Sequence, residues 1–289
     1  MIYGSVCSGI EAASVAWGSI GWRPEFFSEI DPFPSAVLRH HYPETPNLGD
    51  MTEYEEWPDH VIDVLVGGTP CQDNSIGYAA GAKRAGDGMD GARSGLAFDF
   101  AGIAGRYEPE WVVWENVPNT LSARHSGGFL RFLSELGDAG YFCSWRVIDG
   151  RCFGLSDQPR KRLVVVGNRS DWRRAAAVLL EPEGTTRNSE KVASTAPVLT
   201  ARGGMALDDR TPCILDEYGA RLSTPLEWER AMGFPDHYTA IRWRGKPSQD
   251  CPDGPRWKAL GNSMEVRMMR WIGSRIEAVQ SMTATLKAE

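Results

Sequence analysis

The sequence lacks paired cysteines, a long hydrophobic run and a basic N-terminal stretch. It opens with six uncharged residues and reaches its first basic residue at Arg23, so no signal peptide is expected. No apolar stretch approaches membrane-spanning length. The six cysteines show no C-x-x-C pair and no zinc-ligand spacing with histidine, standing at positions 7, 71, 143, 152, 213 and 251. These absences predict a reduced, cytoplasmic protein without membrane contact or bound metal.

An excess of positive charge is also lacking. The 289 residues carry a formal net charge of -7, which by itself argues against nucleic acid, since binding to nucleic acid depends on neutralising phosphates. The distribution is uneven, because residues 1–66 sum to -9 and the remainder to +2. Basic residues gather in 151–174 and in 239–275. Ordinary solvated faces can give such segments, but an acidic and a basic half predict different ligands for each.

Apolar patterning predicts an α/β fold with a doubly wound, mainly parallel sheet covered on both faces by helices. Strands are expected at 2–6, 25–30, 61–66, 111–114, 141–148 and 163–167, and helices from Glu11, from Pro34, at 94–104 and at 128–139. The core domain is therefore predicted to span 1–168. Residues 169–216 are polar and rich in Gly, Pro and Thr, which indicates a small irregular lobe. Residues 217–289, with helices at 224–232 and 259–277, are predicted to pack back on the core.

The loop after the first predicted strand, Cys7-Ser8-Gly9-Ile10-Glu11, lies where open α/β sheets bind ligands. Glu29 ends the second predicted strand about twenty residues later, where a carboxylate commonly accepts hydrogen bonds from ribose hydroxyls. Asp50 stands near the expected end of a third strand and can receive an adenine amino group. The absence of G-x-G-x-x-G favours a nucleoside-containing cofactor without a pyrophosphate over NAD. A merely structural turn remains the alternative for this loop.

A second loop carries a candidate nucleophile. Cys71 follows Pro70 after an apolar run and opens a glycine-rich segment of about two dozen residues, which is longer than most connections and typical of a moving lid. A lone cysteine more often packs in a core, yet this placement favours a reactive thiol. The next predicted strand ends near Glu115, which places a carboxyl group at the same sheet edge; capping of a helix or contact with solvent is the alternative.

Five segments resemble, in order, the motifs of the DNA (cytosine-5) methyltransferases. They are Pro70-Cys71-Gln72, Glu115-Asn116-Val117, Gln158-Pro-Arg160-Lys-Arg162, the stretch from Arg221-Leu-Ser to Gly233-Phe-Pro, and Gly261-Asn262-Ser263. Each tripeptide is common, but the ordered set spans nearly the whole chain and is specific. The first loop is most similar to phage and prophage members. The resemblance implies a Rossmann-like S-adenosylmethionine-dependent core with a target-recognition lobe at about 169–216.

The resemblance implies covalent catalysis. The Cys71 thiolate is expected to attack carbon 6 of cytosine and so make carbon 5 nucleophilic. Glu115, protonated or sharing a proton with ring nitrogen 3, would stabilise the adduct. Arg162 is expected to donate to the carbonyl oxygen of the base, and Arg160 to position Glu115 or contact phosphates. The base must be flipped from the duplex, and the loop from Gln72 to Arg93 is expected to close over it.

The resemblance also implies two sets of contact residues. The set for S-adenosyl-L-methionine comprises Ser8, Gly9, Ile10, Glu29, Ile30, Asp50, Met51, Pro70, Asn262 and Ser263. The set for double-stranded DNA comprises Gln72, Lys83, Arg84, Arg93, Gln158, Thr200, Arg202 and Gly203, the last three in a segment that can equally be a connector contacting phosphates alone. Two positions depart from the family. Cys7 replaces a phenylalanine that usually faces adenine, and Glu11-Ala12 replaces a pair of glycines.

The resemblance implies a monomer, and the sequence identifies no cognate restriction enzyme. Three other functions remain as alternatives. An RNA (tRNA) cytosine-5 methyltransferase would share the architecture, although the phage-like motif variants count against it. A cysteine hydrolase would need a histidine partner for Cys71, and none of the five histidines stands near the cysteine loop in sequence. A catalytically inactive DNA-binding module conflicts with the presence of Cys71, Glu115, Arg160 and Arg162.

Overall fold

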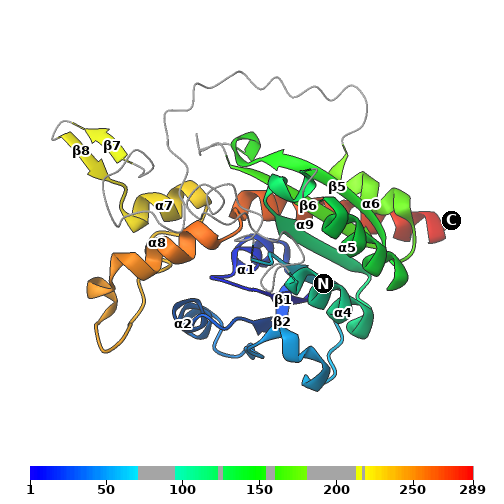
Figure 1. Ribbon diagram of the computed structural model, residues 1–289, viewed down its shortest axis with the longest axis horizontal. Helices are drawn as coiled ribbons and strands as arrows, with labels where there is room; N and C mark the ends of the chain where they lie inside the picture. Colours follow the sequence, from blue (N-terminus) through cyan, green and yellow to red (C-terminus); the bar gives the residue numbers. More distant parts are fainter. Residues whose placement is uncertain (71–94, 123–125, 154–159, 181–212, 217–218, 289) are drawn as a thin grey trace.

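The computed structural model describes residues 1–70, 95–122, 126–153, 160–180, 213–216 and 219–288. Its centre is a six-stranded sheet of order β2-β1-β3-β4-β6-β5 (Figure 1). The sequence-predicted positions that lie outside the described residues are Cys71, Gln72, Lys83, Arg84, Arg93, Gln158, Thr200, Arg202 and Gly203. The roles predicted for them stay predictions.

The sheet confirms the predicted α/β class. Strands β1 (Ile2–Val6), β2 (Arg23–Ser28), β3 (Val64–Gly67) and β4 (Trp111–Asn116) pair in parallel. Strand β6 (Lys161–Asn168) runs antiparallel both to β4 and to the edge strand β5 (Phe142–Asp149). Every residue of β3 and β4 is buried, as their continuous apolar runs require when helices cover both faces.

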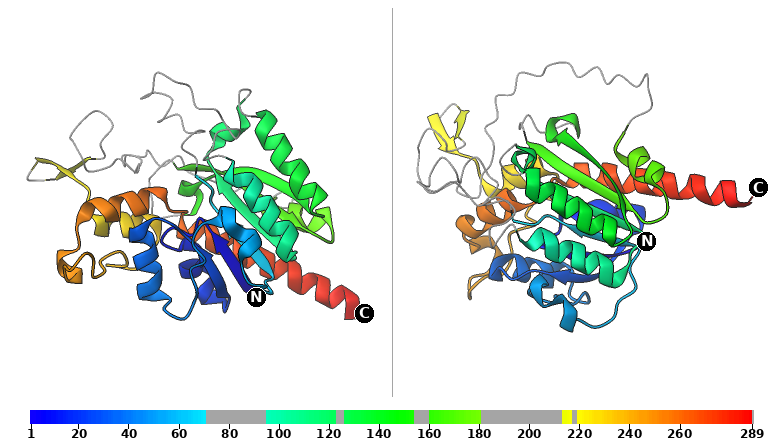
Figure 2. Two further views of the ribbon diagram at one scale, coloured as in Figure 1. Left: turned by 60° about the horizontal axis from the view of Figure 1, so that its bottom comes forward. Right: turned by 45° about the vertical axis from the view of Figure 1, so that its right-hand side comes forward.

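Helices form a layer on each face of the sheet, as the two views of Figure 2 show. On one face, α4 (Leu96–Tyr107) and α5 (Ser126–Asp138) bury Phe100 and Phe132 against the strands. On the other, α1 (Ala12–Trp17), α6 (Trp172–Leu179) and the long α9 (Val266–Ala288) share one hydrophobic cluster. The Nε1 of Trp17 donates to the carbonyl oxygen of Met269 at 2.7 Å, which fixes α1 to α9. The C-terminal segment therefore packs against the sheet.

The C-terminal helices differ from the prediction of one helix over 259–277. The structure has α8 (Asp253–Asn262) and α9, separated at Ser263–Glu265, because the Glu265 carboxylate accepts the backbone N–H of Met268 at the start of α9. Helix α7 (Pro225–Met232) begins with a capping box between Thr224 and Glu227. Near it, strands β7 (Cys213–Asp216) and β8 (Gly219–Leu222) form a separate two-stranded sheet.

The third strand expected before Asp50 is also absent from the described residues. A single bridge joins Phe27 to Asn47, and Asp50 then caps the 3-10 helix η2 (Met51–Glu56). Helix α2 (Pro32–His41) begins two residues before the expected position, capped by Asp31. The other 3-10 helices within the described residues are η1 (Gly18–Ile20), η4 (Pro118–Leu121), η5 (Gly150–Phe153) and η6 (Ser248–Asp250). None of the helices in the described ranges is long and apolar enough to span a bilayer.

Candidate active site

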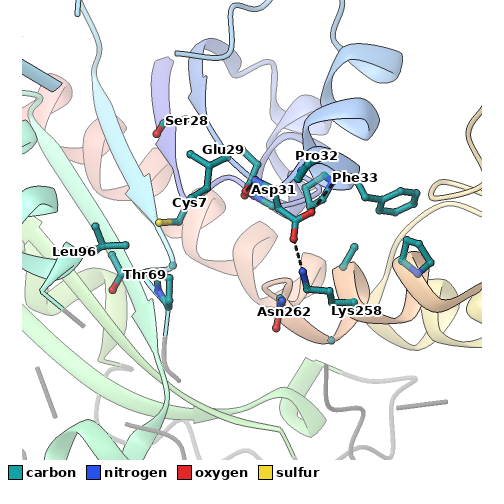
Figure 3. Close-up of a pocket in the computed structure, with 18 of the residues that line it drawn as sticks. Cys7, Ser28, Glu29, Asp31, Pro32, Phe33, Thr69, Leu96, Lys258 and Asn262 are labelled. Carbon is teal, nitrogen blue, oxygen red and sulfur yellow. Dashed lines mark hydrogen bonds and ion pairs between the residues drawn. The ribbon is translucent and has the colours of Figure 1, made fainter. Parts of the chain in front are cut away.

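A pocket of about 550 Å³ opens at the carboxyl ends of strands β1 to β4. The loops after these strands line one side of it, and helix α8 lines the other with residues from Gly254 to Asn262 (Figure 3). The sheet topology explains this position, because parallel strands end at one edge and leave space between diverging loops. Glu115, Arg160 and Arg162 lie on the wall of the same pocket. The cofactor and catalytic residues predicted from separate motifs therefore share one cavity.

Most of the predicted cofactor contacts line this pocket. They are Gly9, Glu29, Ile30, Asp50, Met51, Pro70 and Asn262. Ser8, Ile10 and Ser263 lie behind the wall and bind backbone or neighbouring side chains. The Ser8 hydroxyl donates to Ser5 O at 2.9 Å, and the Ile10 carbonyl accepts from the Tyr238 hydroxyl at 2.9 Å. These three residues are not part of the pocket lining, and the cofactor contacts of all ten residues stay predictions.

The Glu29 carboxyl group is fixed by two backbone amides at the pocket. Gly9 N donates to Glu29 Oε2 at 2.8 Å, and Asp31 N donates to Oε1 at 2.7 Å. Gly9 has φ 57, a left-handed conformation that glycine adopts without strain, so its N–H can turn toward the carboxylate. Burial raises the pKa of Glu29, while these two bonds act against that rise. The pair of amides holds the carboxylate at the end of β2, where it faces the pocket.

Cys7 contributes to the pocket wall as an apolar group. Its Sγ lies 3.3 Å from the Sδ of Met51, and both side chains line the cavity. Burial raises the pKa of the Cys7 thiol, with further contributions from Glu29 and Asp50. The thiol is therefore protonated at neutral pH and behaves as a small hydrophobic side chain. Two polarizable sulfur atoms here give a soft surface suited to a flat aromatic ring.

The Glu11 side chain does not line the pocket, although Glu11 belongs to the loop after β1. Its side chain is 1% exposed and is absent from the pocket lining. The carboxylate caps α1, accepting Ser14 N at 3.1 Å and the Ser14 hydroxyl at 2.5 Å, and the Ser5 hydroxyl also binds it. Burial raises the pKa of Glu11 to about 7. Glu11, at a position where the resemblance predicts glycine, therefore stabilises the first loop through buried hydrogen bonds. Its side chain does not take up space in the pocket.

The part of the pocket that holds the predicted catalytic residues is built by two antiparallel strands. Glu115 is the next-to-last residue of β4, and Arg162 is the second residue of β6. Arg162 Nε lies 2.7 Å from Glu115 Oε1, and Glu115 is 8% exposed. A buried carboxylate loses the hydration that it has in water, so the adjacent guanidinium stabilises it and fixes its orientation. The described ion pair of Glu115 is thus with Arg162.

Arg160 holds the turn between α8 and α9. Its guanidinium donates to Ser263 O at 2.6 Å and to Gly261 O at 3.2 Å. These two carbonyl groups flank Asn262, which lines the pocket. The sequence-based prediction gave Arg160 a role beside Glu115 or at phosphates. The structure gives it a further one, because its contacts place the predicted cofactor turn against the start of β6.

Sequence reasoning missed several residues of the wall, among them Asp31, Phe33, Trp243, Arg244, Trp257 and Lys258. Asp31 and Lys258 form an ion pair across the pocket mouth, with Asp31 Oδ2 and Lys258 Nζ 2.5 Å apart (Figure 3). For Asp31 and for Lys258 the sequence contains a weak signal. Asp31 precedes Pro32 as helix caps do, and Lys258 stands four residues before Asn262 on one helical face.

The side chains that line the pocket suit a nucleoside-containing cofactor. No cluster of three His, Cys, Asp or Glu side chains that could hold a metal ion occurs in the part of the chain that the structure describes. The pocket combines acidic side chains at Glu29 and Asp50 with apolar ones at Ile30 and Met51, and it adds an amide at Asn262. Concave, partly apolar sites with a few convergent polar groups are typical of small-molecule binding.

Comparisons with known proteins agree with this arrangement. The family model described as C-5 cytosine-specific DNA methylase matches residues 1–200. A protein of Escherichia phage P1, named DNA N-6-adenine-methyltransferase, is 28% identical over 96% of this chain and 61% of its own length. The Type II methyltransferase M2.BsuMI of Bacillus subtilis (strain 168) is 27% identical over 99% of this chain and 77% of its own length. The chain thus spans about three fifths of the phage P1 protein.

Two solved structures share the fold. The Entamoeba histolytica methyltransferase EhMeth superposes with a TM-score of 0.68 at 13% identity, covering 96% of this chain and 98% of that one. The Dnmt2 methyltransferase of S. pombe gives a TM-score of 0.65 at 13% identity, with the same coverage of 96% and 98%. At such low identity the similarity concerns the fold alone.

Proposed function

Because the chain belongs to the C-5 cytosine-specific DNA methylase family, we propose that it transfers a methyl group from S-adenosyl-L-methionine to carbon 5 of a cytosine in double-stranded DNA. The observation that carries the proposal is the position of the Glu115–Arg162 pair, which lines the same pocket as Gly9, Glu29 and Asn262. A cofactor and a base that occupy one cavity can place a methyl donor beside its acceptor.

The cofactor would supply an electrophilic methyl group on its sulfonium sulfur. Glu29 presents a fixed carboxylate for ribose hydroxyls at the end of β2. Asp50 accepts the backbone N–H of Thr52 with Oδ1 at 2.9 Å, and its carboxylate is positioned to accept from an adenine amino group as well. Asn262, at the end of α8, would bind the methionine portion. These roles match the chemistry of the side chains on each part of the wall.

Cys71 is the proposed nucleophile. Pro70 lines the pocket, and Cys71 follows it directly in the chain. Its thiolate would form a bond to carbon 6 of the base, which shifts electron density onto carbon 5 and makes that atom nucleophilic. After methylation, loss of the proton at carbon 5 restores the double bond and releases the Cys71 thiolate. Covalent catalysis is needed because cytosine carbon 5 alone is a poor nucleophile.

Glu115 and Arg162 are proposed to act on the ring. A carboxyl group at Glu115 can share a proton with ring nitrogen 3, which offsets the negative charge that develops when Cys71 adds. Arg162 keeps that carboxyl group oriented through the contact of 2.7 Å. The remaining N–H groups of its guanidinium can donate to the carbonyl oxygen of the base. All of β4 and the residues of β6 from Leu163 onward are buried, so the backbone that carries Glu115 and Arg162 is held in place before substrate arrives.

The substrate base must leave the duplex to enter this pocket, because its reactive atoms are stacked inside double-stranded DNA. The predicted contacts of Lys83, Arg84, Arg93 and Arg202 with DNA belong to this proposal, as does action as a monomer. The small sheet of β7 and β8 lies within or next to the segment proposed for target recognition. Base-edge contacts there would give sequence preference, and phosphate contacts would give orientation.

The direct experiment is methyl transfer from labelled S-adenosylmethionine to duplex DNA, analysed by nucleoside mass spectrometry and bisulfite sequencing. We expect 5-methylcytosine in DNA, with transfer RNA in a parallel reaction left unlabelled. Label in transfer RNA alone would favour the RNA methyltransferase. N6-methyladenine would contradict the cytosine target and match the printed name of the phage P1 relative.

The covalent step has its own test. A duplex that carries 5-fluorocytosine blocks the final loss of a proton, so the adduct accumulates and shifts the protein on a denaturing gel. We expect the shift with the unaltered chain and its loss in Cys71→Ser. Cys152→Ser, which removes an exposed thiol elsewhere, serves as the matched control and should retain the shift. A shifted band with Cys71→Ser would exclude Cys71 as the nucleophile.

A further inference from the structure

We infer that Lys258 is a positioning residue for the cofactor, acting through Asp31 on the Glu29 carboxylate. The inference rests on the proposed function. It concerns an ion pair that joins the two walls of the pocket, one built by the loop after β2 and the other by α8. Figure 3 shows the dashed line between Asp31 and Lys258, two residues that line the pocket.

Asp31 interacts through its backbone and through both carboxylate oxygens, and its carbonyl oxygen also accepts the backbone N–H of Ser35 at 3.0 Å. Its backbone N–H donates to Glu29 Oε1 at 2.7 Å. Its Oδ1 accepts the backbone N–H of Phe33 at 3.2 Å and so caps α2. Its Oδ2 lies 2.5 Å from Lys258 Nζ. Because the side chain is held at both oxygens, the backbone of Asp31 is fixed, and with it the amide that faces Glu29.

Glu29 transmits this constraint to the first loop. Its second oxygen, Oε2, accepts the N–H of Gly9 at 2.8 Å. A continuous series of contacts therefore runs from Lys258 through Asp31 and Glu29 to Gly9. It connects three segments of the cofactor pocket that are far apart in the sequence. A carboxylate held in one orientation binds ribose hydroxyls without first losing rotamer freedom, which favours affinity.

The same pair also fixes the position of α8. Lys258 stands four residues before Asn262, so both side chains lie on one face of the helix. Arg160 binds the carbonyl groups of Gly261 and Ser263 at the end of α8. The helix is thus held toward the pocket at two points, by Lys258 in its middle and by Arg160 at its end. Asn262 is placed against the predicted methionine site by both.

An ion pair that only stabilises the fold would have a different effect from one that positions the cofactor. The side chains of Lys258 and Asp31 are 54% and 33% exposed, and partly exposed pairs of this kind change an equilibrium constant by about fivefold at most. A pair that only adds stability would change unfolding by that amount and leave cofactor affinity unaltered. A pair that positions Glu29 and α8 would change affinity for the cofactor by about two- to fivefold, the same free energy expressed as binding.

The test is a double-mutant cycle on the binding of S-adenosylhomocysteine, measured by calorimetry. Asp31→Asn keeps an acceptor for the Phe33 N–H and therefore keeps the cap of α2, while it removes the charge. Lys258→Gln keeps much of the apolar stem of the lysine. We expect each single variant to bind about two- to fivefold more weakly. The double variant should bind no more weakly than the weaker single one. Lys246→Gln, which removes an exposed charge from the nearby turn, should bind normally.

Kinetics and stability separate positioning from structure. The KM for S-adenosylmethionine should rise by the same factor in both single variants, while kcat, the KM for DNA and the midpoint of thermal unfolding stay unchanged. Additive losses in the double variant, or unaltered affinity in Asp31→Asn, would overturn the inference while leaving the proposed function intact. Failure of the unaltered chain to bind S-adenosylhomocysteine would contradict the proposed function itself, and the positioning role with it.

Discussion

Arg162 Nε and Glu115 Oε1 lie 2.7 Å apart because β6 runs antiparallel to β4. The end of one strand and the start of the other therefore meet at the same edge of the sheet, where Glu115 is paired in register with Val164. In an all-parallel sheet the start of β6 would lie at the opposite edge, away from the pocket. The antiparallel direction of β6 therefore brings Arg162, from one predicted catalytic motif, next to Glu115, from another.

Replacement of Arg162 should reduce turnover with little effect on cofactor binding. Arg162→Lys retains a positive charge but loses the planar guanidinium, and Arg162→Met loses both. Loss of one preorganised electrostatic partner typically lowers kcat by about 10²- to 10³-fold. Single-turnover methylation of duplex DNA measures this, with Lys161→Gln as a control at the exposed neighbouring position. Near-normal rates in Arg162→Met would show that Glu115 needs no cationic partner.

Arg160 should instead affect both stability and cofactor binding. Arg160→Met leaves the carbonyl groups of Gly261 and Ser263 without this buried donor, and hydrogen bonds to charged groups contribute about 1.5–3 kcal/mol each. We expect the free energy of unfolding to fall by about 3–6 kcal/mol. The KM for S-adenosylmethionine should rise more than kcat falls. Urea unfolding and steady-state kinetics measure the two effects, and a fall in kcat alone would indicate direct contact with the base.

Much of the core followed from patterning in the sequence. The strands at the centre were predicted within a few residues because β3 and β4 are buried on both faces and thus apolar throughout. Helices α1, α4 and α5 were found for the related reason that each buries one apolar side. Helix α6 was missed, because residues 169–216 were interpreted as an irregular lobe, whereas Val178 and Leu179 pack in the core. Patterning failed where buried polar side chains decide the path of the backbone. The break between α8 and α9 depends on the cap by Glu265 and on Arg160, which come from different parts of the chain.

The candidate site likewise contains some residues that the sequence predicted and others that it did not. Glu29, Asp50 and Asn262 were predicted from the sequence and line the pocket. Glu29 follows strand β2, whereas Asp50 caps η2 and Asn262 ends α8. The Asp31–Lys258 pair was missed, since its members are separated by 227 positions and no local pattern joins them. Glu11 was interpreted only as a departure from glycine. Its burial and its contacts with Ser5 and Ser14 depend on the three-dimensional path of the first loop.

Gly273 should be essential for packing of α9 on α1. A Cβ atom at this position would lie 2.5 Å from Trp17 Nε1, an indole that is fully buried and held by Met269. Gly273→Ala should therefore destabilise the fold by about 1–3 kcal/mol, as overpacking does in other cores. At Gly105, near the end of α4, a Cβ would be 3.6 Å from the nearest atom, and Gly105→Ala should be neutral or stabilise by up to about 1 kcal/mol. Thermal unfolding of the two variants distinguishes a steric effect from a general effect of alanine.

Glu11 should give the stability of the protein a recognisable pH dependence. Burial raises its pKa to about 7 in the folded state, against an ordinary value of 4.5. Below pH 4.5 both states hold the proton, so no free-energy difference arises there. As the pH rises toward 7 the unfolded chain loses the proton and the folded chain retains it, so the unfolded state is favoured.

The magnitude follows from the size of this shift. At about 1.4 kcal/mol per pKa unit, ionisation of Glu11 would cost the folded state about 3 kcal/mol by pH 8. Glu11→Gln keeps an acceptor for Ser14 and cannot ionise. The difference in free energy of unfolding between Glu11→Gln and the unaltered chain should therefore move in favour of the variant between pH 5 and pH 8.

Urea unfolding at several pH values measures this difference, which cancels the contributions of other groups. Glu227→Gln provides a control of opposite sign, because the Arg221 guanidinium holds the pKa of Glu227 at about 2. The stability that Glu227 contributes is present above its ordinary pKa and is lost as the pH falls toward 2. Parallel pH profiles for Glu11→Gln and the unaltered chain would mean that the Glu11 carboxylate is ionised in the folded protein, held by its serine partners in spite of burial.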